Sequence, residues 1–537
     1  MDTVVEYLRV NGPSLTSEIA ESLVSSEGIS PEAARKRVSR SRVEVKRLAF
    51  LVFPRKARFV YLPGQFGSDL YWSRLVAALQ STNSAYGYAI AAVRARGDIV
   101  PEAYFPIVSG APVRQARHLS SSLIAARLEE IGLFRRIAVP GVGPCIAIAK
   151  DDEYYRHIGM ETNARLTAED ILLAAVRDWA KKLGLVSYDR VAVRSREKLA
   201  TVGTFAWDLT APTYLGGMST VTKSGTSKPG FLVADVLLSD ATAVSTVEPF
   251  VRKCTTLRAL RNVGPCLQMF VAERYMKTAF QLLKKHGIIP ATPRTLFGKE
   301  VAEALTQVAS VLTNVARHII DQDKLDEIFK RLGKIEGAAT QLRGTLFEFM
   351  AAAYWRRGAD NVALNRIYKV EEGEAEADVV VVRNGVSVTF VECKGYSPYA
   401  TVPDEQVLRW LQVRIPRLYK YARQHPEWSR LQIHFELWTS GKINDDMAAQ
   451  VSKAKAEVKS TRYTLDLKLG SDVLAAFESR HETELAAAFE KHFVPVVRLS
   501  DEDTEEALID ESKDDNDGWD AFLTVKPRRR SVVRAKA

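Results

Sequence analysis

The chain has 537 residues and a formal net charge of +10, from 75 lysines and arginines against 65 aspartates and glutamates. This length suggests about three or four domains, and the basic balance favours a polyanionic partner. No apolar run approaches the ~20 residues of a membrane span, and the first residues lack a signal-peptide pattern. The four cysteines favour a reducing, cytoplasmic setting, because they show neither CxxC pairs nor zinc-ligand spacing.

Three helices and two strands are predicted in the first 66 residues. Helices are expected at 3–10, at 17–26 and from Pro31 onwards, with strands at 50–53 and 58–62. Proline favours the start of the third helix, because it suits the first helical turn. Seven basic residues are assigned to that helix: Arg35, Lys36, Arg37, Arg40, Arg42, Lys46 and Arg47.

This order of elements resembles a winged helix-turn-helix domain. The resemblance implies that the third helix enters the major groove of double-stranded DNA and that the basic turn, with Lys56 and Arg58, contacts the backbone. The alternative is a solvated basic face or a protein-interaction wing. Residues 84–150 repeat the plan, with helices at 86–96, 101–108 and 113–131 and a hairpin after them. Glu129 and Glu130 dilute its basic residues, so contact with DNA and contact with a neighbouring domain both stay open.

Residues 165–298 alternate between helical and strand patterns. Helices are expected at 168–183, 248–260 and 275–286, and strands at 186–193, 204–210, 230–238 and 267–272. Residues 298–340 then show apolar residues at helical spacings of three and four, which predicts a connecting helix or small bundle.

The sequence EADVVVVRNGVSVTFVECKGY, residues 376–396, predicts a hairpin with acidic groups at its open end. Apolar runs flank Arg383-Asn384-Gly385, a strong turn signal. Asp378 begins the first strand and Glu392 and Lys394 end the second, where alternate residues face the same side. Two neighbouring carboxylates suit Mg²⁺. A lysine beside the metal can orient or deprotonate a water, or stabilise charge on a phosphate.

Asp378 and Glu392-Cys393-Lys394, with Glu348 on the preceding helix 342–358, resemble the signature of the PD-(D/E)XK, restriction-endonuclease-like superfamily. The helix at 404–424 and the strand at 431–438 continue that family's order of elements, whereas Ala377 replaces the usual proline. The resemblance implies catalytic roles for Asp378, Glu392, Lys394 and Glu348. It also implies Mg²⁺, replaceable by Mn²⁺, on Asp378, Glu392 and the backbone carbonyl of Cys393. Gln412, on the helix after the strand pair, is a further candidate for the site. The alternative is that it is a buried or solvent-facing amide without a role in the site.

The strand FLVADVL resembles TFVECKG by position, which suggests an earlier, degenerate copy of the same fold. Asp235 falls where Glu392 lies, but Leu237 replaces Lys394 and cannot do the chemistry of an amine. We therefore expect this region to form a mixed sheet flanked by helices and to serve as a scaffold or DNA clamp.

The sequence thus predicts a multidomain α/β protein with two winged-helix domains, a degenerate and an intact endonuclease-like α/β domain, and a helical segment between the last two. The expected boundaries are 1–70, 71–155, 156–297, 298–340 and 341–498, followed by a charged, disordered tail at 499–537.

The expected function is a metal-dependent DNA endonuclease in restriction, phage defence or repair. The alternatives are a non-catalytic DNA-binding regulator or architectural protein with decayed nuclease folds, and RNA processing. A homodimer or a partner protein stays open.

Overall fold

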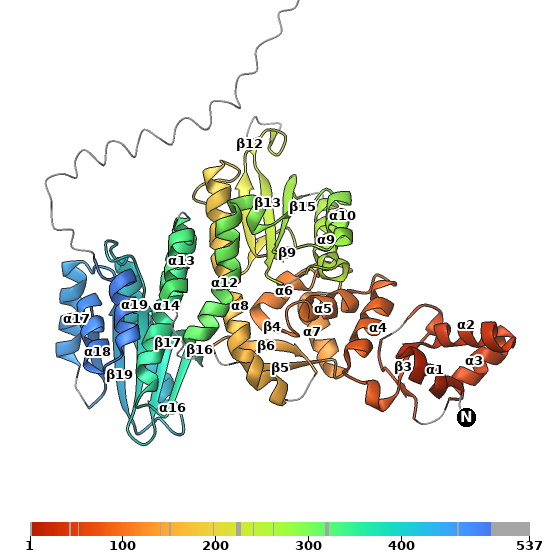
Figure 1. Ribbon diagram of the computed structural model, residues 1–537, viewed down its shortest axis with the longest axis horizontal. Helices are drawn as coiled ribbons and strands as arrows, with labels where there is room; N and C mark the ends of the chain where they lie inside the picture. The colour runs from red at the N-terminus through yellow and green to blue at the C-terminus, as the bar shows by residue number, and fades with distance from the viewer. Residues whose placement is uncertain are drawn as a thin grey trace, which may run out of the picture. The chain divides into compact units, whose positions relative to one another are not determined.

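The computed structural model describes residues 3–495, except 42–43, 52, 140, 150–151, 197, 222–226, 240, 261, 317–321, 334 and 459–460. Helices and strands alternate along these residues to form a multidomain α/β protein (Figure 1). Arg42 and the charged tail predicted to be disordered lie outside the described residues. None of the helices in the described part of the chain is long and apolar enough to cross a bilayer.

Three helices and a small antiparallel sheet form the N-terminal part. Ser30 caps the third helix by accepting a hydrogen bond from the Ala33 N–H at 3.2 Å. The strand order is β1-β3-β2, so the last strand is central. The elements are α1 (Thr3–Asn11), β1 (Ser14–Leu15), α2 (Thr16–Glu27), α3 (Pro31–Ser39), β2 (Lys46–Arg47) and β3 (Phe59–Tyr61).

The third helix is shorter than the sequence predicted. It ends at Ser39 with Arg40 as its C-cap, and Lys46 and Arg47 lie on strand β2 instead. Val45 and Leu48 are buried on either side of that strand, so the chain leaves the helix to bring them into the core. At the described residues of the strand predicted at 50–53, which are Phe50, Leu51 and Phe53, no strand forms, and Phe50 adopts a left-handed conformation with φ 63°.

The next sheet repeats this strand order. β4, β6 and β5 pair antiparallel, again with the last strand in the centre. The third helix begins at Ser121, capped by Ser120, later than the predicted residue 113. The elements are α4 (Asp69–Gln80), α5 (Ala85–Arg94), β4 (Ile99–Pro101), α6 (Phe105–Val108), α7 (Ser121–Glu130), β5 (Phe134–Val139) and β6 (Gly143–Ile148).

The third sheet has five strands in the order β15-β14-β13-β10-β7. Strands β7, β10 and β13 pair antiparallel, and β14 and β15 are added parallel to β13. The sheet is therefore mixed, and it is flanked by helices, as predicted. Helices α9 and α10 lie beside this sheet (Figure 1), and their buried apolar residues share one core cluster with residues of β13 and β14. The elements are α8 (Asp152–Lys182), β7 (Ala192–Val193), β10 (Leu209–Thr213), β13 (Gly230–Leu237), α9 (Val244–Arg258), β14 (Cys266–Ala272), α10 (Lys277–Lys285) and β15 (Ile289–Ala291).

The other elements of this part of the chain are short strands and a short helix. They are β8 (Ala200–Val202), β9 (Phe205–Trp207), β11 (Thr220–Val221), β12 (Ser227–Lys228) and α11 (Pro293–Phe297). Two helices then fill the predicted connector, α12 (Lys299–Ala316) and α13 (Gln322–Leu332).

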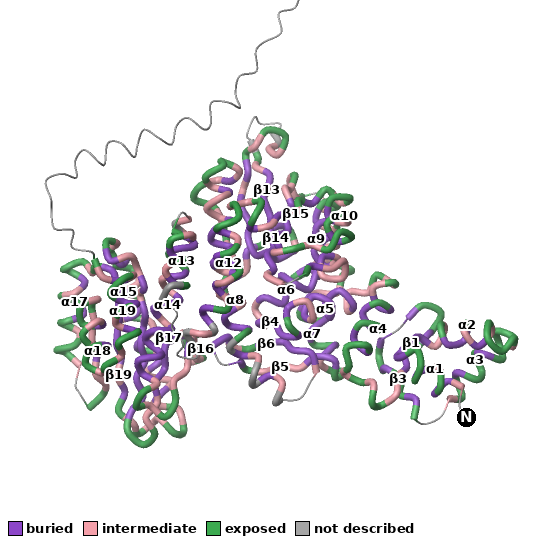
Figure 2. Tube along the Cα trace, viewed as in Figure 1, coloured by how far each residue is buried: buried purple, intermediate pink, exposed green. Residues whose placement is uncertain are grey.

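The fourth sheet has the same topology as the third. A helix precedes three antiparallel strands, and two parallel strands follow, each after a helix. Its central strands are buried, whereas the outer helices expose one face to solvent (Figure 2). The elements are α14 (Glu336–Arg356), β16 (Asn361–Val370), β17 (Gly373–Arg383), β18 (Ser387–Lys394), α15 (Asp404–Arg409), α16 (Ile415–Gln424), β19 (Gln432–Thr439), α17 (Asp445–Glu457), β20 (Thr464–Lys468), α18 (Gly470–Ser479) and α19 (Thr483–Phe493).

Candidate active site

Asp378 and Glu392 lie opposite each other on neighbouring antiparallel strands. Val379 of β17 pairs with Val391 of β18, and the same register continued by one residue places Asp378 across from Glu392. Both carboxylates are buried. The backbone N–H of Cys393 donates to Asp378 Oδ2 at 2.7 Å, which fixes the orientation of that carboxylate.

Two cationic side chains hold the acid pair. Lys394 Nζ lies 2.7 Å from Glu392 Oε1, so the two residues share one side of the strand as the spacing predicts. Arg414 Nη1 lies 2.6 and 2.5 Å from the two oxygens of Glu392 and 3.6 Å from Asp378 Oδ1. The guanidinium therefore bridges the two acids. Arg414 was not predicted from the sequence, whereas Gln412, which was, is exposed.

The two ionised acids destabilise each other. Burial and the charge of Glu392 raise the pKa of Asp378 to about 7, against the opposing effect of Lys394 and Arg414. Burial acts to lower the pKa of Lys394, but the carboxylates of Glu392 and Asp378 outweigh it and raise that pKa above its usual value. Lys394 is therefore protonated at neutral pH.

Glu348 joins the same charge cluster from helix α14. Burial and the negative charges of Asp378 and Glu376 raise its pKa well above the usual value, and a hydrogen bond from the Asn365 side chain opposes this shift. Asn365 has a φ of 49° and lies across from Asp378 in β16, between the pairs Leu364–Val379 and Arg366–Ala377. A non-glycine residue in the left-handed region beside an acid cluster is typical of a functional site. No strand was predicted here, so Asn365 was missed at the level of the sequence.

A divalent cation fits the chemistry of this donor set. Among the described residues, no group of three or more His, Cys, Asp or Glu side chains is arranged to hold a metal ion. Asp378 and Glu392 nevertheless form a pair of oxygen donors whose mutual repulsion favours a bound cation, and Arg414 already places positive charge between them. The Cys393 carbonyl is the further ligand that the family resemblance implies.

An equivalent acid pair lies in the third sheet. Leu209 of β10 pairs with Ala234 of β13, and the register continued by one residue places Asp208 across from Asp235. The backbone N–H of Val236 donates to Asp208 Oδ2 at 2.8 Å, as Cys393 does to Asp378. The two sheets therefore share a local hydrogen bond as well as their topology.

Buried cations neutralise this second acid pair. Arg194 binds Asp208 Oδ1 at 3.0 Å, Asp170 Oδ1 at 2.9 Å and Glu169 Oε2 at 3.2 Å. Lys253 binds Asp235 and also donates to the carbonyls of Ile107 at 3.0 Å and Ala206 at 2.9 Å. The Lys253 side chain is 0% exposed. Two buried protein cations thus bind these acids, and neither was predicted from the sequence.

The predicted DNA-binding residues form an exposed basic surface on α3, β2 and the following turn. The exposed residues are Arg35, Lys36, Arg37, Arg40, Lys46, Arg47, Lys56 and Arg58. Arg37 pairs with Glu27, and Arg47 donates to the Ser39 carbonyl at 2.8 Å. The remaining side chains point their charge toward solvent, where phosphates can reach them.

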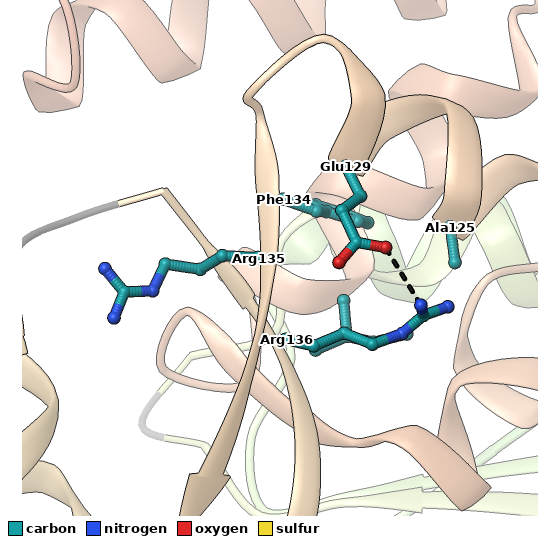
Figure 3. A pocket seen from close by; sticks show the side chains of 6 residues that line it. Ala125, Glu129, Phe134, Arg135 and Arg136 are labelled. Carbon is teal, nitrogen blue, oxygen red and sulfur yellow. Dashed lines mark ion pairs between the residues drawn. The ribbon is translucent and has the colours of Figure 1, made fainter.

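The corresponding basic residues of the second small sheet are partly compensated. Arg136 pairs with Glu129 at 3.0 Å and with Glu102 at 3.2 Å. Figure 3 shows Arg136 reaching toward Glu129 across a shallow hollow, with Arg135 directed away from it. Arg135 lies over the Tyr155 ring at 5.4 Å. Strand β5 therefore offers its basic residues to a partner less freely than the N-terminal basic surface does.

Comparison of the sequence with models of protein families and with curated proteins found no match.

Proposed function

We propose that the chain is a metal-dependent DNA endonuclease of the PD-(D/E)XK type, with two winged-helix domains that bind duplex DNA. The observation that carries the proposal is the cluster of Asp378, Glu392 and Lys394, with Glu348 beside it. Glu392 and Lys394 lie at the end of β18 as expected, whereas Asp378 lies in the middle of β17, which begins five residues earlier than the sequence predicted. The fourth sheet follows helix α14, and its three antiparallel strands are followed by two parallel ones. This mixed arrangement supports the same superfamily. The helix–strand–helix–helix–strand–strand order of both small sheets supports winged helices.

Each residue of the cluster has a role that its surroundings support. Asp378 and Glu392 would hold Mg²⁺ or Mn²⁺, which when bound activates water and polarises the phosphate. The raised pKa of Lys394 supports a protonated amine that orients water and stabilises charge on the phosphate, rather than a general base. Glu348 would assist from α14. The exposed basic residues of α3 and the wing would position the duplex.

Plasmid cleavage tests this proposal. Supercoiled DNA is incubated with Mg²⁺ or Mn²⁺ and the native protein, Asp378→Asn or Lys394→Ala. Both variants should lose at least roughly 10²-fold in rate. Glu436→Gln is the matched control, because Glu436 is a buried carboxylate of the same sheet that binds Trp438 and Lys468 instead of the cluster. Cleavage that persists in both site variants overturns the proposal.

One observation favours a second candidate function, a non-catalytic winged-helix DNA-binding regulator or architectural protein. Arg414 binds Glu392 much as Lys253 binds Asp235, so both acid pairs carry a protein cation. Tight DNA binding by the native protein without metal-dependent cleavage would support this candidate. A preference for RNA over duplex DNA in the same binding assay would instead favour RNA processing.

A further inference from the structure

Arg414 reaches the acid pair because the helix that carries it is interrupted. Residues 410–414 form one π-helical turn between α15 and α16, in which the Ile415 N–H bonds to the Trp410 carbonyl. Pro416 lacks an N–H and disfavours a regular α-helix at this point, which explains the wider turn. Trp410, Ile415 and Leu418 are buried around Arg414, so its charge stands on an apolar helix face directed at the sheet.

Two protein cations offset the charges of Asp378 and Glu392 without a metal, while Glu348 and Glu376 add further negative charge beside them. Asp378 and Glu392 can contribute two negative charges, and Lys394 and Arg414 contribute two positive ones within 2.5–3.6 Å. A divalent cation added between the same carboxylates would meet the guanidinium that already lies there. Like charges repel strongly at such distances in a buried site. The metal and Arg414 therefore exclude each other.

The two sheets differ in how firmly the protein cation is held. Lys253 is wholly buried and uses backbone carbonyls as well as Asp235. The Arg414 side chain is 16% exposed, and within the described residues its guanidinium engages the acids through Nη1 alone. Lys253 is fully enclosed in the core, whereas Arg414 keeps part of its side chain in contact with solvent.

We propose that Arg414 is a removable counter-ion that holds Asp378 and Glu392 in the metal-free protein and competes with a divalent cation for them. The inference rests on the proposed metal site and adds a positioning residue to it. Lys253 is a counter-ion of the same kind that stays bound to Asp235, so the third sheet binds no metal. Binding of one metal ion per chain, in the fourth sheet, is the consequence.

Isothermal titration of the full chain with Mn²⁺ tests this directly. Arg414→Gln removes the competing charge and should bind Mn²⁺ at least about ten-fold more tightly than the native protein. Arg414→Lys keeps the charge and should stay within a few-fold of native. Arg417→Gln is the matched control, because Arg417 lies at the start of the adjoining helix α16 but donates to the Glu374 carbonyl. Asp378→Asn should abolish binding in every background.

The outcomes separate this inference from the proposed function. Equal or weaker binding by Arg414→Gln, with binding still lost in Asp378→Asn, overturns the counter-ion and leaves the metal site standing. Mn²⁺ binding by Arg414→Gln but not by the native protein supports the counter-ion role of Arg414 and overturns the proposed metal-dependent enzyme function. The absence of binding in all variants overturns both. Melting curves give a second readout, since Mn²⁺ should raise the Tm of Arg414→Gln more than that of the native protein.

Discussion

The carboxylates of Asp378 and Glu392 lie opposite each other across β17 and β18, buried and bridged by one guanidinium nitrogen. This arrangement makes ionisation of Asp378 costly, and its pKa is about 7. The same face-to-face relation recurs between Asp208 and Asp235, where burial and Asp208 raise the pKa of Asp235 to about 6 against Lys253. These charges and the exposed basic surface lead to measurable expectations for stability, cleavage and DNA binding.

The stability of the metal-free protein should fall between about pH 4 and pH 7. The pKa of Asp378 is raised from 3.8 to about 7 on folding, so the folded state binds the proton more tightly and this stabilisation is lost as the pH rises. The shift corresponds to a decrease on the order of 4 kcal/mol in the free energy of unfolding across this window. Urea denaturation across this window should show a smaller pH slope for Asp378→Asn, and identical slopes would contradict the assignment.

Lys394 should act through its positive charge. Lys394→Met is expected to slow cleavage roughly 10²–10³-fold, with DNA affinity within a few-fold of native. Lys394→Arg should recover part of the rate, because arginine keeps the charge and cannot act as a base. Cleavage rates under single-turnover conditions provide the measurement. An arginine variant as inactive as the methionine variant, with normal metal binding, would instead indicate a deprotonated lysine.

Lys253 should be essential to the stability of the third sheet. Lys253→Met leaves the Asp235 carboxylate buried without its cation. It also removes the amine that donates hydrogen bonds to two backbone carbonyls. We expect a loss of about 3–5 kcal/mol in the free energy of unfolding. Lys455→Met, which breaks the exposed pair with Asp466, should cost about 1 kcal/mol or less. Similar losses in chemical denaturation of the two variants would refute the buried role.

The exposed arginines of α3 should set the salt dependence of DNA binding. Arg35→Gln combined with Arg40→Gln should reduce the slope of log K against log salt by about 0.9 for each phosphate that the variant no longer neutralises. Lys299→Gln removes another exposed charge, from α12, and should leave the slope unchanged. Fluorescence anisotropy with a short duplex at several salt concentrations measures the slopes. Equal slopes for all three proteins would remove α3 from the interface.

Some of the missed residues carried a signal in the sequence. Arg414 falls on the stripe of Val407, Trp410 and Leu418, and Lys253 on that of Phe250 and Leu257, at helical spacings of three and four. A charged residue on such a stripe faces the core and needs a partner there. The spacing therefore shows that each cation is buried against the sheet, although it does not show which carboxylate it meets.

Local spacing by itself determined the hairpin, the shared side of Glu392 and Lys394 and the match of Asp235 to Glu392, because alternation on a strand is a property of neighbouring residues. Only the tertiary structure decided the partners. Arg414 meets Glu392 across 22 residues and Lys253 meets Asp235 across 18, and Asn365 lies beside Asp378 because β16 pairs with β17. These long-range contacts depend on how each helix packs on its sheet and on the register of the strands. Side-chain packing across the core determines the helix positions and the register.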